Sequence, residues 1–207
     1  MSPVMQFDRN KLKAVILRTC ELCPPDKLGA VKLHKVLYFL DMISFARSGQ
    51  AATGAEYRKR PFGPTCVQLL PTLRAMEQAG ELAITETDYF GLRKKEFHAR
   101  TAPEMNRLST AEAALLEGVV DFVCNQNTAK SISEISHQAP WEMAEFGETI
   151  GYDTALMLFP SQPSAEALEL VEGEAEAIEA ARSNGDSVDR PTYRDFRSRV
   201  LSQIGHG

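Results

Sequence analysis

The segment from about Ala30 to Arg47 constrains the fold most, because it is strongly apolar and has the period of a helix. Of its 18 residues 12 are apolar, and one stripe consists of Leu33, Val36, Leu37, Leu40 and Ile43. A helix that is apolar around so much of its circumference is buried among other elements. We therefore expect this helix at the centre of the core, with Gly49 ending it.

Further helices are predicted on both sides of this segment. Asp8 or Asn10 can cap a first helix, and Pro24-Pro25 ends it. We expect a loop over residues 48–63, and a third helix that has Pro64 just inside its start and ends at Gly80. Capping-box spacing at Ser109–Glu112, and again at Ser131–Glu134, predicts the start of two more helices.

After Gly80 the apolar period changes from that of a helix to that of a strand. Leu82 and Ile84 alternate with polar residues, residues 88–91 supply a turn, and Phe97 and Ala99 alternate again. This pattern predicts a β-hairpin. The expected fold is therefore mainly α: a compact helical domain with one β-hairpin and a helical C-terminal extension.

A domain boundary is expected at Pro160–Pro163, which gives a domain of residues 1–160 and an extension of residues 161–207. The extension is predicted to hold a helix rich in Glu and Ala at 165–181, a linker at 183–189 and a final helix from Pro191. The apolar seam of the final helix consists of Tyr193, Phe196, Val200 and Ile204. A narrow seam suits one partner helix, so we expect it either to form a homodimer or to grip another protein.

Composition limits where the chain resides. No run of eighteen apolar residues exists, so no membrane-spanning helix is expected. Residues 1–13 lack the apolar core and cleavage site of a secretory signal, which predicts a cytoplasmic protein. The 4 cysteines do not form a disulfide scaffold in a chain of 207 residues, and a cytoplasmic location would keep them reduced.

The net charge of −5 hides a division along the chain. Residues 1–107 carry 17 basic and 11 acidic side chains, residues 108–190 carry 3 and 16, and residues 191–207 carry 3 and 1. Such a division predicts a basic face and an acidic face that steer a charged partner, or two halves that attract each other.

Motifs that would indicate an enzyme or a metal site are weak. Cys20 and Cys23 form a lone C-x-x-C, whereas a zinc site needs four ligands and the second pair is absent. The sequence contains no G-x-S-x-G, no H-E-x-x-H and no Walker-type glycine loop around its 4 histidines. We therefore expect a protein without a metal, a cofactor or catalysis, and a small metal- or thiol-dependent enzyme stays as an alternative.

Two basic clusters suggest another function. One consists of Arg58, Lys59 and Arg60, and the other, in the predicted hairpin, consists of Arg93, Lys94 and Lys95. A helix followed by a basic hairpin resembles the wing of winged-helix DNA-binding regulators. However, the basic half has a weak field and the acidic half would repel DNA, so nucleic acid is not the expected partner. The hairpin charges are equally explained as protection of its strand edges.

His137 and Trp141 lie four residues apart, at the spacing of one helical turn. They are expected to form a stacked pair in the core or to contact a partner, because tryptophan is enriched at interface hot spots.

Three elements in order resemble the Panacea domain of SocA-like antitoxins, also described as phage-associated and GepA-like. The first is Lys32-Leu-His-Lys-Val-Leu-Tyr-Phe-Leu40, the second runs from Tyr57 to Pro64 and ends in Phe-Gly-Pro, and the third is His137-Gln-Ala-Pro-Trp141. The resemblance covers residues 28–160. The residues that match the family pattern by position are Lys32, Lys35, Tyr38, Phe62, Gly63, Pro64, His137 and Trp141.

The resemblance implies a mainly α-helical bacterial antitoxin that binds and neutralises a cognate protein toxin encoded beside it. Family members pair with toxins of several unrelated classes, and the SocA antitoxin presents its toxin to the ClpXP protease. A proteolytic adaptor function is therefore a further expectation. The matched residues mark either a contact surface or the fold, since Gly63 and Pro64 shape the entry to the third helix.

Overall fold

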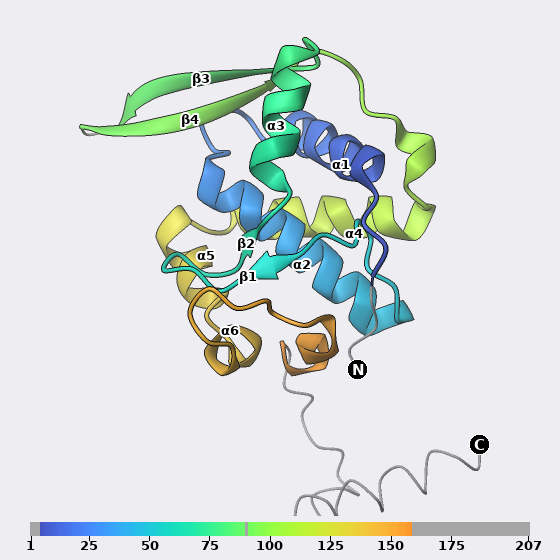
Figure 1. Ribbon diagram of the computed structural model, residues 1–207. Coiled ribbons are helices and arrows are strands. Elements are labelled where there is room, and N and C mark those ends of the chain that lie inside the picture. The colour runs from blue at the N-terminus through green and yellow to red at the C-terminus, as the bar shows by residue number, and fades with distance from the viewer. Residues whose placement is uncertain (1–4, 90, 159–207) are drawn as a thin grey trace, which may run out of the picture. The chain divides into compact units, whose positions relative to one another are not determined.

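The computed structural model describes residues 5–89 and 91–158, and Figure 1 shows their arrangement. The predicted boundary at Pro160–Pro163 and the two helices predicted beyond it lie outside the described residues. The helices are α1 (Arg9–Leu22), α2 (Ala30–Ser48), α3 (Leu69–Gln78), α4 (Thr110–Val120), α5 (Ala129–Ile135) and α6 (Ala139–Met143). Short helical turns are η1 (Met105–Arg107), η2 (Asp121–Asn125) and η3 (Tyr152–Met157), and the strands are β1 (Tyr57–Arg58), β2 (Thr65–Cys66), β3 (Leu82–Tyr89) and β4 (Leu92–Ala99). The mainly α fold is confirmed.

Helix α2 is the centre of the core, as its apolar stripe predicted. Every residue from Leu33 to Met42 except His34 is buried. The helix contacts α1, α4, α5 and η3 (Figure 1). It ends at Gly49, which has the left-handed φ of 71° that favours glycine at this position. Because nearly its whole circumference is covered, α2 also buries charged residues, and these residues position the site described below.

Local capping explains the starts of the helices around α2. The Asp8 carboxylate accepts a hydrogen bond from the Lys11 N–H at the start of α1, and Ser109 and Glu112 form the predicted capping box of α4. The cap of α5 differs from the prediction. Thr128 and Ser131 form it, rather than Ser131 and Glu134, so the helix starts at Ala129.

The predicted hairpin is confirmed. Strands β3 and β4 pair in an antiparallel register that joins Leu82 to Ala99 and Asp88 to Arg93, and Gly91 takes a φ of 78° in the turn. Leu82 and Phe97 are buried against the helices. Figure 1 shows the rest of the hairpin extending away from the helices, at the end of the molecule where α3 lies.

A second pair of strands lies in the stretch that the sequence predicted as a loop followed by a helix. Tyr57 pairs with Cys66, and Arg58 pairs with Thr65. As a result α3 begins at Leu69, five residues after Pro64. The opposite edge of β1 also pairs, because the Ile150 N–H donates to the Tyr57 carbonyl at 2.8 Å and the Lys59 N–H donates to the Glu148 carbonyl at 3.0 Å.

Within the described part of the chain, no helix combines the length and the apolar character needed to cross a membrane.

Candidate functional site

The chain leaves β1 and reverses at Arg60-Pro61-Phe62-Gly63. The Gly63 N–H donates to the Arg60 carbonyl at 2.9 Å, and Gly63 has a φ of 89°. A Cβ atom at this position would lie 2.3 Å from Ser136 Oγ and 2.6 Å from Lys35 Nζ. Glycine is therefore required here both by the backbone conformation and by the close approach of α2 and α5.

Lys35 of α2 fixes the far side of this turn. Its side chain is 1% exposed, and Nζ donates to the Pro64 carbonyl at 3.0 Å. Burial lowers the pKa of the Lys35 ammonium to about 7, because the charged form loses its hydration. A buried lysine on the central helix thus holds the Phe-Gly-Pro segment through a main-chain oxygen.

One serine of α5 and the serine that follows the helix continue this set of contacts. Ser133 Oγ donates to the Phe62 carbonyl at 3.0 Å, and Ser136 Oγ donates to the Ser133 carbonyl at 2.7 Å. Sequence reasoning did not select either serine, because a polar residue on a short helix gives no local signal that it is buried. The only signal was their position just before His137.

The His137 and Trp141 rings stack, with centroids 3.9 Å apart and planes inclined by 15°. Trp141 Nε1–H donates to the Arg60 carbonyl at 3.1 Å, which connects α6 to the turn. Lys59 Nζ lies 4.2 Å from the centre of the indole ring and donates to the Ala144 carbonyl at 2.9 Å. Trp141 is half-buried at the edge of the core, so it both packs and remains accessible.

Two other residues of the family pattern lie elsewhere on α2. Lys32 Nζ donates to the Cys124 carbonyl of η2 at 2.9 Å. Tyr38 is fully buried, and its ring meets the Tyr57 ring edge-on with centroids 5.4 Å apart. The structure thus brings Lys35, Phe62, Gly63, Pro64, His137 and Trp141 together, whereas Lys32 and Tyr38 pack the core beside them.

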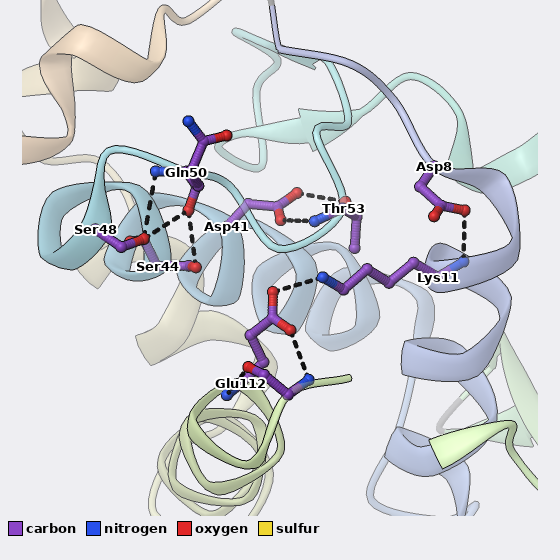
Figure 2. Close-up of polar contacts among 9 residues, drawn as sticks. Asp8, Lys11, Asp41, Ser44, Ser48, Gln50, Thr53 and Glu112 are labelled. Atoms are coloured by element: carbon purple, nitrogen blue, oxygen red, sulfur yellow. Dashed lines mark hydrogen bonds and ion pairs between the residues drawn. The ribbon is translucent and has the colours of Figure 1, made fainter. Parts of the chain in front are cut away.

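A buried carboxylate positions β1 against α2. Asp41 accepts hydrogen bonds from the Thr53 N–H and hydroxyl, each at 2.5 Å, and from the Tyr57 hydroxyl at 2.7 Å. The Tyr152 hydroxyl lies 3.2 Å from the same carboxylate. Figure 2 shows the Asp41 carboxyl group directed at Thr53. Burial raises the pKa of Asp41, and the four donors oppose that rise. The sequence did not single out this network.

Large apolar side chains are exposed where the turn meets α6. Phe62 is 71% exposed, and Met143 and Phe146 are each 65% exposed. The Arg60 guanidinium lies 5.8 Å from the centre of the Phe146 ring. We call Phe62, Trp141, Met143 and Phe146 the turn–α6 surface; Figure 1 shows α6 beside the loop that joins β1 to β2. Such an apolar surface is typical of a protein-binding site.

The two basic clusters are not brought onto one face. Arg58, Lys59 and Arg60 lie at β1, near the middle of the view in Figure 1, whereas Arg93, Lys94 and Lys95 lie on β4, in the hairpin at its top. Several of these side chains also pair within the chain. The ion pairs are Arg58–Glu56 at 2.7 Å, Arg93–Glu86 at 3.4 Å and Lys94–Glu96 at 3.3 Å.

The cysteines lie in or beside the core. Cys23 is buried where α1 ends, and its thiol donates to the Pro24 carbonyl at 3.7 Å. Burial raises the pKa of the Cys20 thiol to about 12. Among residues 5–89 and 91–158, no three or more His, Cys, Asp or Glu side chains cluster in a way that could hold a metal ion.

A known protein family matches the chain. The family model described as antitoxin SocA-like, Panacea domain, matches residues 33–142. The matched range runs from α2 to α6 and therefore includes Lys35, the Phe-Gly-Pro turn, both serines, His137 and Trp141. Neither the curated proteins nor the solved structures include one that matches the chain.

Proposed function

The chain belongs to the SocA-like antitoxin family that carries the Panacea domain, and we propose that it neutralises a cognate protein toxin by binding it directly. Neutralisation then requires no chemical step by this chain. The affinity comes from the surface that the two proteins bury, and the uneven charge of the chain steers their encounter.

The observation that supports this proposal is the set of contacts that the family-pattern residues make. Lys35 and Trp141 direct their polar groups at main-chain oxygens of Pro64 and Arg60. His137 stacks on Trp141, and Gly63 permits the close approach of α2. These residues therefore support the turn, and Phe62 on that turn is left exposed. A rigid framework that presents exposed aromatic side chains supports a binding function.

The test is co-expression of this chain with the protein encoded beside it. We expect the neighbour to stop growth when expressed alone, and this chain to restore growth and to co-purify with it in a fixed ratio. Restored growth without a stable complex would instead support an adaptor that delivers the toxin to a ClpXP-type protease, and loss of rescue in a strain without that protease would identify this route. A harmless neighbour, or no rescue, would contradict the proposed function.

A further inference from the structure

We propose that the toxin docks on the turn–α6 surface and that its matching face is an apolar recess bordered by basic side chains. This inference rests on the proposed function and specifies the contact and the chemistry of the partner.

The side chains of this surface are of the kinds that form the centres of protein interfaces. Phenylalanine, tryptophan, methionine and arginine are enriched there. The surface supplies the first three with Phe62, Trp141, Met143 and Phe146, and Arg60, which lies over Phe146, supplies the fourth. Each exposed aromatic ring offers a large apolar area whose burial drives association. An apolar recess on the partner would cover these rings.

The surface is ordered before any partner arrives. The Arg60 carbonyl accepts from both the Gly63 N–H and Trp141 Nε1–H, and the Phe62 carbonyl accepts from Ser133 Oγ. The Phe62 side chain is thus exposed on a backbone that is fixed on both sides. Because this segment is already ordered, binding loses little conformational entropy, and the contact area contributes more fully to affinity.

The charges around the turn–α6 surface indicate the sign of the charges that surround the apolar recess of the partner. Four exposed carboxylates lie on α5, on α6 and just after α6: Glu134, Glu142, Glu145 and Glu148. Cations also lie nearby: Arg60 lies over Phe146, and Lys59 is directed at carbonyl oxygens of Glu142 and Ala144. Arg58 is paired with Glu56, and Lys130 lies on α5 with Glu134. Over residues 108–158 the chain has 8 acidic side chains and 1 basic side chain. A partner with basic residues around its recess is therefore attracted, and an acidic one is repelled.

The apolar part is tested with Phe62→Ser combined with Phe146→Ser in the full chain. The probe is the immobilised neighbouring protein, recovered from the co-expressed complex. We expect the dissociation constant to rise at least about tenfold, because two interface centres are removed. The matched control is Leu70→Ser on α3, which is 49% exposed, and its dissociation constant should change less than about twofold. Circular dichroism and thermal unfolding confirm that each variant is folded.

The charge part is tested with Glu142→Lys combined with Glu145→Lys, and Glu77→Lys on α3 is the control. We expect the double variant to associate about tenfold more slowly at low salt, and its rate to approach that of the wild type as salt rises, because salt screens the attraction. The Glu77→Lys variant should associate at nearly the wild-type rate.

The outcomes separate this inference from the proposed function. If the wild-type chain neither binds nor neutralises the neighbour, the proposed function fails, and the inference fails with it. If the wild type neutralises and the Phe62/Phe146 variant does so equally well, the docking surface is wrong while the function stands. If light scattering shows that the variant loses self-association but keeps toxin binding, the surface joins two copies of this chain, which also overturns the inference. If the Glu142/Glu145 variant associates as fast as the wild type or faster, the inference that basic residues surround the partner's recess is wrong.

Discussion

The indole nitrogen of Trp141 donates to the carbonyl oxygen of Arg60 at 3.1 Å, although the two residues lie 81 positions apart in sequence. The same oxygen accepts from the Gly63 N–H at 2.9 Å, so one atom joins the turn after β1 to helix α6. The turn and the helix therefore form one unit, and variants on either side of this bond should affect both.

Trp141→Phe should cost about 1 kcal/mol of the free energy of unfolding, because it removes the indole donor but keeps a ring to stack on His137. Trp141→Ala should cost roughly 2–4 kcal/mol, because the stacking and packing are lost as well. Urea unfolding of both variants and the wild type measures these differences. Equal losses for Phe and Ala would show that the hydrogen bond, rather than the ring, supplies the stability.

Gly63→Ala should destabilise the protein by about 2 kcal/mol more than Gly80→Ala. Both glycines have a positive φ, 89° and 72°, so both substitutions carry the same kind of backbone strain. Only at Gly63 would the new methyl group displace Ser136 Oγ and Lys35 Nζ from their hydrogen bonds, since nothing lies within 4 Å of the corresponding position at Gly80. Thermal and urea unfolding compare the two variants, and equal losses would contradict the close approach of α2 and α5.

The buried Lys35 predicts a rise of stability with pH. Burial lowers its pKa from 10.5 to about 7 in the folded protein, so between these values the unfolded chain binds more protons. The contribution of Lys35 to the free energy of unfolding is therefore lowest below pH 7 and increases as pH rises through this window. The free energy of unfolding of Lys35→Met minus that of the wild type should fall by about 1 kcal/mol per pH unit between pH 7.5 and 9.5.

Urea unfolding of the wild type and Lys35→Met at several pH values measures this difference. The comparison isolates Lys35, because buried thiols such as Cys66, whose pKa burial raises to about 12, are present in both proteins. If the free energies of unfolding of the two proteins changed with pH in parallel, the Lys35 ammonium would keep its charge in the folded protein.

Asp41→Ala should cost about 3 kcal/mol, because it leaves the Tyr57 hydroxyl and the Thr53 N–H buried without their acceptor. Tyr152→Phe is the control and should cost only about 1 kcal/mol, since Asp41 then keeps its donors from Thr53 and Tyr57. Chemical unfolding measures both. A loss as large for Tyr152→Phe as for Asp41→Ala would place the stability in the Tyr152 bond to the Ala55 carbonyl instead.

Features decided by nearby residues were predictable from the sequence. The α2 stripe, the Gly49 stop and the β3–β4 alternation each depend on side chains within one element or one turn. The pairing of β1 was not predictable, because two-residue strands have no period and their second partner, residues 148–150, lies about ninety positions away. The cap of α5 was ambiguous, since Thr128–Ser131 and Ser131–Glu134 both have the spacing of a capping box.

The site was predictable only as a set of residues. The resemblance selected Lys35, Gly63, His137 and Trp141, but nothing in the sequence indicated that Lys35 is buried, because a charged side chain on a helix is normally assigned to solvent. The sequence also did not indicate that the polar Ser133 is buried or that the apolar Phe146 is exposed. Each has a burial that its residue type does not suggest, and only the tertiary contacts decide it.

The hydrogen bonds that hold the turn to α2, α5 and α6 are accepted by the carbonyl oxygens of Arg60, Phe62 and Pro64. Every residue type has such an oxygen. The outward side chains at Arg60 and Phe62 are thus not needed to maintain these hydrogen bonds, so substitutions there leave the backbone beneath in place. If the turn–α6 surface binds the toxin as proposed, specificity and foldability are encoded at separate atoms of the same residues, and a change of target would need substitutions of only a few exposed side chains.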